Sequence, residues 1–367
     1  MIDTVRICIP LENVIINDYD IFRPDPKYID RKTFCYVDVP DDLKHMTYPK
    51  MTVKLIPQIG KPPIKEFRIE ISSIPKFVFG ENVSECKDND FDSVVRVLQR
   101  KLSLLHIHID KEDIENAYVS RLDYGKNIPI DIRSKTIIST LKNLPQSKHL
   151  SADENNYKNH GQEFRIQNDL LDYKVYDKIL DVQKNDKVAT ILMPDETRKP
   201  LLDYLNEDMG IEDIIRFEFS MQSRAKIAEI FGKCDIESDL TFKDVFNSEY
   251  SRKVNLYAFD RFIKKHATYA FLTRTQYGVI LDKCVKANKT IRQALMIIGL
   301  RALQTRDNGI QALKDRYNNT SIDINSIEQD ILDLDLKNNT IKKTLEYIRD
   351  TIDKNIPLRL FNKGGAL

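Results

Sequence analysis

The chain has 367 residues, 41% of them hydrophobic and 31% charged, which is enough apolar side chain for two domains or for one large domain with an appendage. No apolar run approaches the roughly 20 residues that a membrane-spanning helix needs, and the N-terminal segment lacks a signal-peptide cleavage site, so we expect a cytoplasmic protein with no membrane partner. The five cysteines are odd in number and never spaced as CxxC, which argues against a disulfide framework and against a zinc site.

The first 144 residues alternate between strand and helix patterns. Apolar residues recur at helical spacing at Val94, Val95, Leu98 and Leu102, for example, and other segments alternate with a period of two. A polar stretch at 145–161 is typical of a loop. The expected strands are 4–9, 33–39, 51–71 (interrupted at 60–63) and 118–124, and the expected helices are 89–105 and 133–144.

The second half is expected to extend the sheet and then to become helical. A hairpin of 163–167 with 173–181, a helix at 200–208 and a strand around Arg216 come first. The later helices are expected at 241–247, 254–269, 273–287 and 290–304, followed by an acidic helical tail within 326–354, and Thr290 is the expected N-cap of the fourth. We therefore divide the chain into a domain at 1–239, a basic helical region at 240–320 and a helical tail at 321–367.

Charge is unevenly distributed between these parts. The net charge is only +1, but residues 240–317 carry 15 Lys/Arg against 6 Asp/Glu, which leaves about −8 for the remainder. A basic module joined to an acidic remainder is typical of a protein that binds nucleic acid with one of its parts. The alternative is an ordinary lysine-rich helical surface.

Three short segments repeat the pattern Arg, apolar, carboxylate, apolar. Because side chains two apart on a strand share a face, each segment places an Arg and an acid together, and a fourth segment does the same with Tyr176 and Lys178. If the four strands share a sheet, one face collects carboxylates, a phenol and cations, as metal-assisted phosphodiester cleavage by tyrosine requires. A solvated sheet face with salt bridges is the alternative. The repeated segments are Arg68-Ile69-Glu70-Ile71, Arg121-Leu122-Asp123-Tyr124 and Arg216-Phe217-Glu218-Phe219.

These motifs, in this order, resemble those of the filamentous-phage gene II/gene X replication initiators, from the first residue to about Phe231. The opening Met1-Ile2-Asp3, a strand and Pro10 are similar to that family's start. Ile74 separates Ser73 from Pro75, where the family motif E-I-x-x-S-P-x-K has Ser and Pro adjacent. The other matching segments are Glu70-Ile71 with Pro75-Lys76, Gly80 and Asn82-Val83; Val119 to Asp123 (I-S-R-I-D in the family); Val175 to Lys178 (A-Y-L-K); and Ile215 to Glu218 (V-R-F-E).

The resemblance implies a rolling-circle initiator related to the HUH nucleases: an α+β protein with an antiparallel sheet, which nicks one DNA strand, stays attached to the 5′ phosphate and later rejoins the strand. It places the nucleophile on Tyr176, whereas Tyr173, at an odd offset, is expected on the opposite face. Lys178 is a candidate to lower the phenol pKa or to hold the phosphate. A divalent cation, Mg²⁺ or Mn²⁺, suits hard oxygen ligands, so Glu70, Asp123 and Glu218 are the candidate ligands.

Two further sets of residues complete the prediction. His106 and His108 form a His-hydrophobe-His pattern that would hold a metal if both side chains faced one site. A surface or packing role for the pair is the alternative.

The expected partners are origin DNA, duplex and single-stranded, with a host helicase or polymerase possible. For a phage-encoded protein, the expected location is the host cytoplasm. The candidate DNA-binding residues are Arg68, Arg121, Arg216, Lys264, Lys265, Arg274, Lys286, Lys289, Arg292 and Arg301. For Arg68, Arg121 and Arg216, neutralising the carboxylates of the candidate metal site is the alternative role.

Two other functions fit the sequence. One is a non-catalytic origin-binding or repressor protein, in which the basic helices act and the sheet is a scaffold. The other is a mobilisation relaxase of related chemistry. Recovery of protein bound to a 5′ DNA end separates both nicking enzymes from the binding protein.

Overall fold

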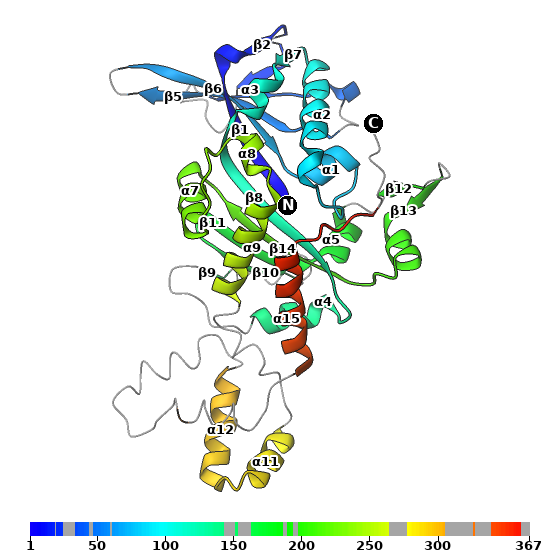
Figure 1. Cartoon of the computed structure of the whole chain (residues 1–367), viewed down its shortest axis with the longest axis vertical. Helices are drawn as coiled ribbons and strands as arrows, with labels where there is room; N and C mark the ends of the chain where they lie inside the picture. Colours follow the sequence, from blue (N-terminus) through cyan, green and yellow to red (C-terminus); the bar gives the residue numbers. More distant parts are fainter. Residues whose placement is uncertain are drawn as a thin grey trace.

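The computed structural model describes residues 1–18, 20–24, 34–43, 47–58, 61–142, 151–152, 163–185, 189–193, 197–263, 277–304, 326 and 339–360. Its centre is a 10-stranded sheet in which every neighbouring pair is antiparallel. Helices pack around this sheet, so the predicted α+β class with an antiparallel sheet is confirmed (Figure 1). The strands, in spatial order, are β3 (Phe22–Pro24), β4 (Phe34–Val37), β5 (Lys50–Gln58), β6 (Lys61–Ile71), β1 (Ile2–Pro10), β8 (Tyr118–Pro129), β14 (Ile214–Met221), β11 (Leu171–Asp177), β10 (Glu163–Gln167) and β9 (Ser151–Ala152).

The helices and the remaining short elements connect these strands. Two small two-stranded sheets, β2 (Val14–Ile16) with β7 (Ile107–Ile109) and β12 (Thr190–Leu192) with β13 (Arg198–Pro200), lie beside the main one. No helix within the described ranges is long and apolar enough to cross a membrane. The helices are α1 (Ile74–Phe79), α2 (Phe91–Ser103), α3 (Lys111–Glu115), α4 (Ser134–Lys142), α5 (Lys178–Asn185), α6 (Leu201–Asp203), α7 (Arg224–Lys233), α8 (Phe242–Val245), α9 (Ser248–Phe262), α11 (Tyr277–Lys286), α12 (Ile291–Gln304) and α15 (Asn339–Lys354), with short turns η1 (Leu11–Asn13), η3 (Asp41–Leu43), η4 (Asp88–Asp90) and η6 (Tyr204–Asp208).

The central strands have one apolar and one polar face, as strict alternation requires. On β14, Phe217 and Phe219 are buried on the apolar face, which packs against α7 and α9. The ring of Tyr173, from β11, stacks on Phe262 with centroids 5.1 Å apart. Tyr173 therefore belongs to the core, as its odd offset from Tyr176 predicts.

The C-terminal helix returns to the sheet and packs against α9. Arg349 Nε donates to Asp260 Oδ1 at 2.9 Å, and Asn355 Nδ2 donates to the Ser248 carbonyl at 2.7 Å, so α9 and α15 run antiparallel. The buried residues of α8, α9 and α15 belong to the same core cluster as the sheet. The boundary predicted after residue 239 therefore falls inside one core, and α15 is part of it rather than a separate tail.

Between α9 and α15 the chain leaves this core and forms α11 and α12, which lie below the sheet in Figure 1. Their buried residues, such as Ile280 and Ile297, are outside the core clusters that contain the sheet. The basic helices are thus an insertion between two paired helices. The predicted loop at 145–161 and the part of the tail at 327–338 lie, apart from 151–152, outside the described residues.

Hydrogen bonds from capping side chains explain where the boundaries of two elements differ from the predicted ones. The strand expected to run to residue 181 ends at Asp177, because Asp177 Oδ1 accepts the Leu180 N–H at 2.9 Å and begins α5. The helix expected from 254 begins at 248, where Asn247 caps it through the N–H groups of Glu249 and Tyr250. In both cases a capping Asp or Asn, rather than hydrophobic periodicity, sets the boundary.

Candidate active site on the polar face

The polar faces of β11, β14 and β8 bring together residues that are far apart in sequence. Register aligns Tyr176 with Arg216 and Lys174 with Glu218 across β11 and β14. On the other side of β14, Ser220 aligns with Asp123 of β8. Cross-strand partners share a face. The predicted convergence of the tyrosine with two of the acids is therefore present.

Tyr176 lies at the wall of a cavity on this face. The cavity has a volume of about 360 Å³, and its lining comes from β10, β11, β14 and the first helix after Tyr176, α5. The Tyr176 hydroxyl donates to Glu218 Oε2 at 3.4 Å, a long hydrogen bond. The lining residues are Glu163, Arg165, Lys174, Tyr176, Asp181, Lys184, Asn185 and Glu218.

Lys178 is close to Tyr176, but not by the predicted route. It begins α5 instead of continuing the strand, and its Nζ lies 5.9 Å from the centroid of the Tyr176 ring. The amine is buried and donates to Asp181 Oδ2 at 2.9 Å. Burial, followed by the charge of Arg216, lowers the pKa of Lys178. Lys178 is thus a buried neighbour of the phenol and not a cation on the open face.

Burial dominates the electrostatics of the phenol. It raises the pKa of Tyr176 well above its ordinary value, although the positive charge of Arg216 opposes this change and the negative charge of Glu218 adds to it. The expected lowering of this pKa by Lys178 is therefore not present in the protein alone.

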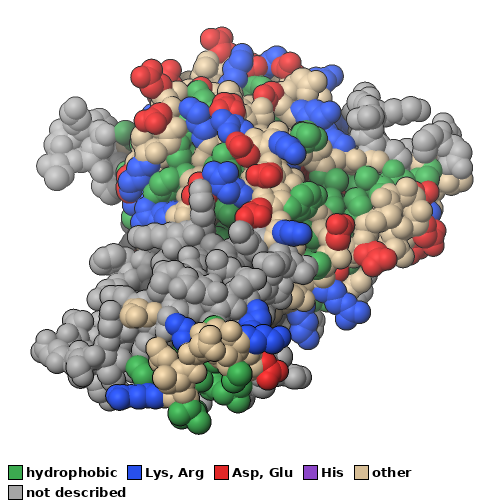
Figure 2. Space-filling view, turned by 60° about the horizontal axis from the view of Figure 1, so that its bottom comes forward, with side chains coloured by type: hydrophobic (Ala, Val, Ile, Leu, Met, Phe, Trp, Pro, Cys, Tyr) green, Lys and Arg blue, Asp and Glu red, His purple; other side chains and the backbone are tan. Residues whose placement is uncertain are grey.

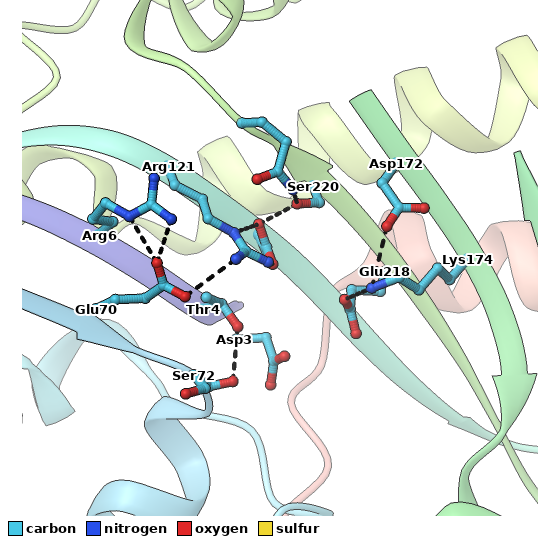
Figure 3. A network of polar contacts seen from close by, with 12 residues as sticks. Asp3, Thr4, Arg6, Glu70, Ser72, Arg121, Asp172, Lys174, Glu218 and Ser220 are labelled. Atoms are coloured by element: carbon cyan, nitrogen blue, oxygen red, sulfur yellow. Dashed lines mark hydrogen bonds and ion pairs between the residues drawn. The ribbon is translucent and has the colours of Figure 1, made fainter. Parts of the chain in front are cut away.

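The carboxylates of the predicted metal set are held in ion pairs (Figure 3). Glu70 pairs with Arg6 and, at 3.3 Å, with Arg121. Arg121 Nη2 also lies 2.7 Å from Asp123 Oδ2. Because β1 separates β6 from β8, Glu70 reaches this group only through the two arginines.

Glu218 is the acid nearest to Tyr176, and Lys174 holds it. Lys174 Nζ lies 2.8 Å from Glu218 Oε1 and 3.4 Å from Asp172 Oδ2. Burial disfavours the charged form of Glu218, but Lys174 and Arg216 outweigh burial and lower its pKa to about 2. Burial raises the pKa of Asp123 to about 6 despite the neighbouring Arg121. The two acids therefore differ in how readily they ionise.

Arg216 is a buried structural cation. Its Nη2 lies 2.6 Å from Asp3 Oδ1, and its Nη1 donates to Asn127 Oδ1 at 2.9 Å. Only 3% of the Arg216 side chain is exposed, which does not fit the predicted contact with DNA. Arg68 and Arg121 are also paired with acids, Arg68 Nε with Glu66 Oε2 at 2.9 Å, but each remains about one-fifth exposed.

The polar face offers oxygen ligands for a cation without a preformed cage. Among the described residues, no three His, Cys, Asp or Glu side chains come together as a metal site. Mg²⁺ is commonly held by one or two carboxylates plus substrate phosphates and water. Asp123 and Glu218 lie on adjacent strands of the same face, but Asp123 is fully buried and only Glu218 lines the cavity, whereas Glu70 lies beyond Arg121.

The histidine pair is not part of this site. His106 precedes β7 in a turn, with a φ of 57°, and only His108 lies on the strand. Both side chains are exposed, and β7 pairs with β2 at the top of Figure 1, away from β11 and β14. The turn at His106 interrupts the alternation on which the prediction depended.

Four of the predicted DNA-binding residues of the basic region lie on α11, α12 and the turn between them. Lys286 and Arg292 are exposed, and Lys289 is half-buried. Arg301 lies on α12. Lys264, Lys265 and Arg274 fall outside the described residues.

Several residues of the site were not predicted. Lys174 and Asp172 occur two and four residues before Tyr176, so the period of two that selected Lys178 would also have selected them. Asp3 and Arg6 reach the site because β1 lies between β6 and β8. No local sequence signal indicates that placement.

The chain was also compared with known proteins. No family model matches it, and neither the curated proteins nor the solved structures give a match.

Proposed function

We propose that this protein is a rolling-circle replication initiator that nicks one strand of origin DNA with Tyr176 and holds the 5′ phosphate as a phosphotyrosine. The observation that carries the proposal is the cavity beside Tyr176, which also exposes Lys174, Arg165 and Lys184 to a substrate phosphate. The sequence resemblance to filamentous-phage initiators names the same tyrosine.

In this proposal the Tyr176 oxygen attacks phosphorus and the bond to the 3′ oxygen breaks. The proton that the phenol loses ends on the departing oxygen, which leaves as a free 3′ hydroxyl. Glu218 accepts the hydrogen bond of the phenol and orients it. Lys174, which bridges Glu218 and Asp172, is placed to turn toward the phosphate. Reversal of the same step rejoins the strand, because the phosphotyrosine retains the energy of the broken bond.

We further propose that Mg²⁺ or Mn²⁺ assists this step, with Asp123 and Glu218 as its protein ligands. Such an ion would polarise the phosphate and stabilise the charge that develops on it. It would also supply the positive charge that lowers the phenol pKa.

A non-catalytic origin-binding protein is the second candidate. The observation in its favour is that Glu70, Asp123 and Glu218 are all paired with Arg or Lys, as on a scaffold face with salt bridges. A mobilisation relaxase would share the first mechanism and differ in its DNA target.

The deciding experiment compares two tyrosines on opposite faces of one strand. Tyr176→Phe should abolish covalent attachment to a 5′ DNA end, recovered after denaturation, while fold and DNA affinity remain. Tyr173→Phe is the matched control: its buried hydroxyl has no hydrogen-bond partner in the described part of the chain, so its loss should leave attachment intact. Attachment by Tyr176→Phe at the rate of the unaltered protein would overturn the assignment. If the unaltered protein itself forms no attachment, the result favours the non-catalytic origin-binding protein.

A further inference from the structure

The two inserted helices form a compact pair around a short turn. Residues 287–290 connect α11 to α12, and Asn288 adopts a left-handed conformation with a φ of 52°. Thr290 and Gln293 bond reciprocally: the Gln293 N–H donates to Thr290 Oγ1 at 3.3 Å, and Thr290 N–H to Gln293 Oε1 at 2.9 Å. This capping box fixes where α12 begins. The turn therefore sets the direction of the second helix relative to the first.

The helices pack through one apolar stripe each. Ile280 and Cys284 of α11 are buried, as are Ala294 and Ile297 of α12. These positions recur at spacings of three or four residues, which places each pair on one helix face. The opposite sides of both helices are consequently left for solvent or for a partner.

The outward surface combines positive charge with exposed apolar side chains. Residues 277–304 contain five Lys/Arg and one Asp. Lys286 and Arg292 are exposed near the turn. Beside them, Ile291 is 78% exposed and Leu295 is 61% exposed. Figure 2, in which the bottom of Figure 1 comes forward, shows blue and green side chains next to each other on this part.

We propose that α11, the turn and α12 form a helix-turn-helix that reads duplex DNA, with the first turns of α12 in the major groove. Arg292 and Leu295, three residues apart, share one face of α12, where an Arg can contact guanine and an apolar side chain the thymine methyl group. Lys286, at the end of α11, contacts the phosphate backbone. This inference rests on the proposed function for its target, the replication origin.

The positive charge of this surface favours duplex DNA over a second copy of the chain as its partner. An interface between identical surfaces would bring Lys286 and Arg292 against the same cations of the other copy, and like charges in contact disfavour association. A DNA backbone neutralises them and releases its counterions. Exposed apolar residues between the cations fit a groove that presents methyl groups as well as phosphates.

The test uses the full chain and duplexes selected by it from a randomised library. Arg292→Ala should weaken binding to the selected duplex about tenfold or more and remove the preference at one base position. Lys286→Ala should weaken binding to all duplexes similarly and reduce the salt dependence of affinity by about one unit of slope. Arg100→Ala, which removes an exposed arginine from α2 in the sheet-containing unit, is the matched control and should bind as the unaltered chain does.

Unchanged affinity and preference in both variants would overturn the proposal, as would a change of oligomeric state in Leu295→Ala with duplex binding intact. Cleavage of a single-stranded oligonucleotide separates this result from the proposed function. The control Arg100→Ala should cut the oligonucleotide at the rate of the unaltered chain. If the unaltered chain binds a selected duplex through α12 but never cuts, the proposed nicking activity fails while the helix-turn-helix stands.

Discussion

The sheet face and the inserted helix pair use charge in opposite ways. On the sheet, Asp123, Glu218 and Arg216 are buried, and each is held by a partner of opposite sign. On the helix pair, Lys286 and Arg292 face solvent among apolar side chains. Buried, paired charges fix geometry, because breaking one pair leaves an uncompensated charge. Exposed charges of one sign act at longer range on a partner. In the proposed function, positioning and chemistry therefore belong to the sheet and duplex affinity to the helices.

The largest effect should follow from neutralising the acids of the sheet face. Asp123→Asn and Glu218→Gln, made separately, should each slow cleavage by about a hundredfold or more, because each removes an anionic ligand of the proposed cation, which would stabilise the charge of the transition state. Excess chelator should silence the unaltered protein, and Mg²⁺ or Mn²⁺ should restore it. Single-turnover cleavage of an oligonucleotide measures both effects. Full-rate cleavage in chelator would refute the metal assignment.

The next test separates the two regions physically. Replacing residues 264–338 by a flexible linker should abolish tight duplex binding but preserve single-strand cleavage, because α9 and α15 are paired and both remain. Salt titration of duplex affinity, with circular dichroism to verify the fold, measures the outcome. A chain cut after residue 239 is the unsuitable alternative, since it removes α8 and α9 from the core. If the folded deletion variant binds origin duplex as tightly as the full chain, the division of labour is wrong.

A smaller effect should come from Gly125, which pairs with Glu218 across β8 and β14 and lies against the side chain of Arg216. A Cβ at this position would lie 2.6 Å from Arg216 Nη2, so Gly125→Ala should displace the guanidinium from Asp3. We expect a loss of about 1–3 kcal/mol in the free energy of unfolding, the usual cost of overpacking. Denaturant unfolding measures it. Gly232→Ala, where nothing lies within 4 Å of the new Cβ, is the control and should not destabilise the protein.

The smallest effect is expected for the histidine pair. Replacing His106 and His108 together by Ala should leave the nicking rate unchanged and alter stability by less than about 0.5 kcal/mol, because both are exposed. His108 lies on a separate small sheet, and His106 directly precedes it. Oligonucleotide cleavage in Mg²⁺ tests this expectation. A large loss of nicking rate in the double variant would show that the histidine pair acts in the reaction and would again favour it as a metal ligand.

Much of the sheet and its polar face could be predicted from local patterns. The alternation in Arg121-Leu122-Asp123 and in Arg216-Phe217-Glu218 is set by the strand geometry itself, so the shared face followed from the sequence. The end of β11 did not follow, because a capping Asp177 overrides the apolar pattern that continues past it. The pairing of α9 with α15 joins segments separated by a long insertion, and no local signal encodes such a contact.

The position of β11 has a mechanical consequence for a protein that carries DNA on Tyr176. Seven residues of this strand are paired with β14, and five with β10, so ladders of hydrogen bonds hold it on both sides. A pull on a DNA end attached to Tyr176 would act on an interior strand backed by the aromatic core around Tyr173. The load would be shared by two ladders, and the attached end would remain fixed while the duplex ahead of it is unwound.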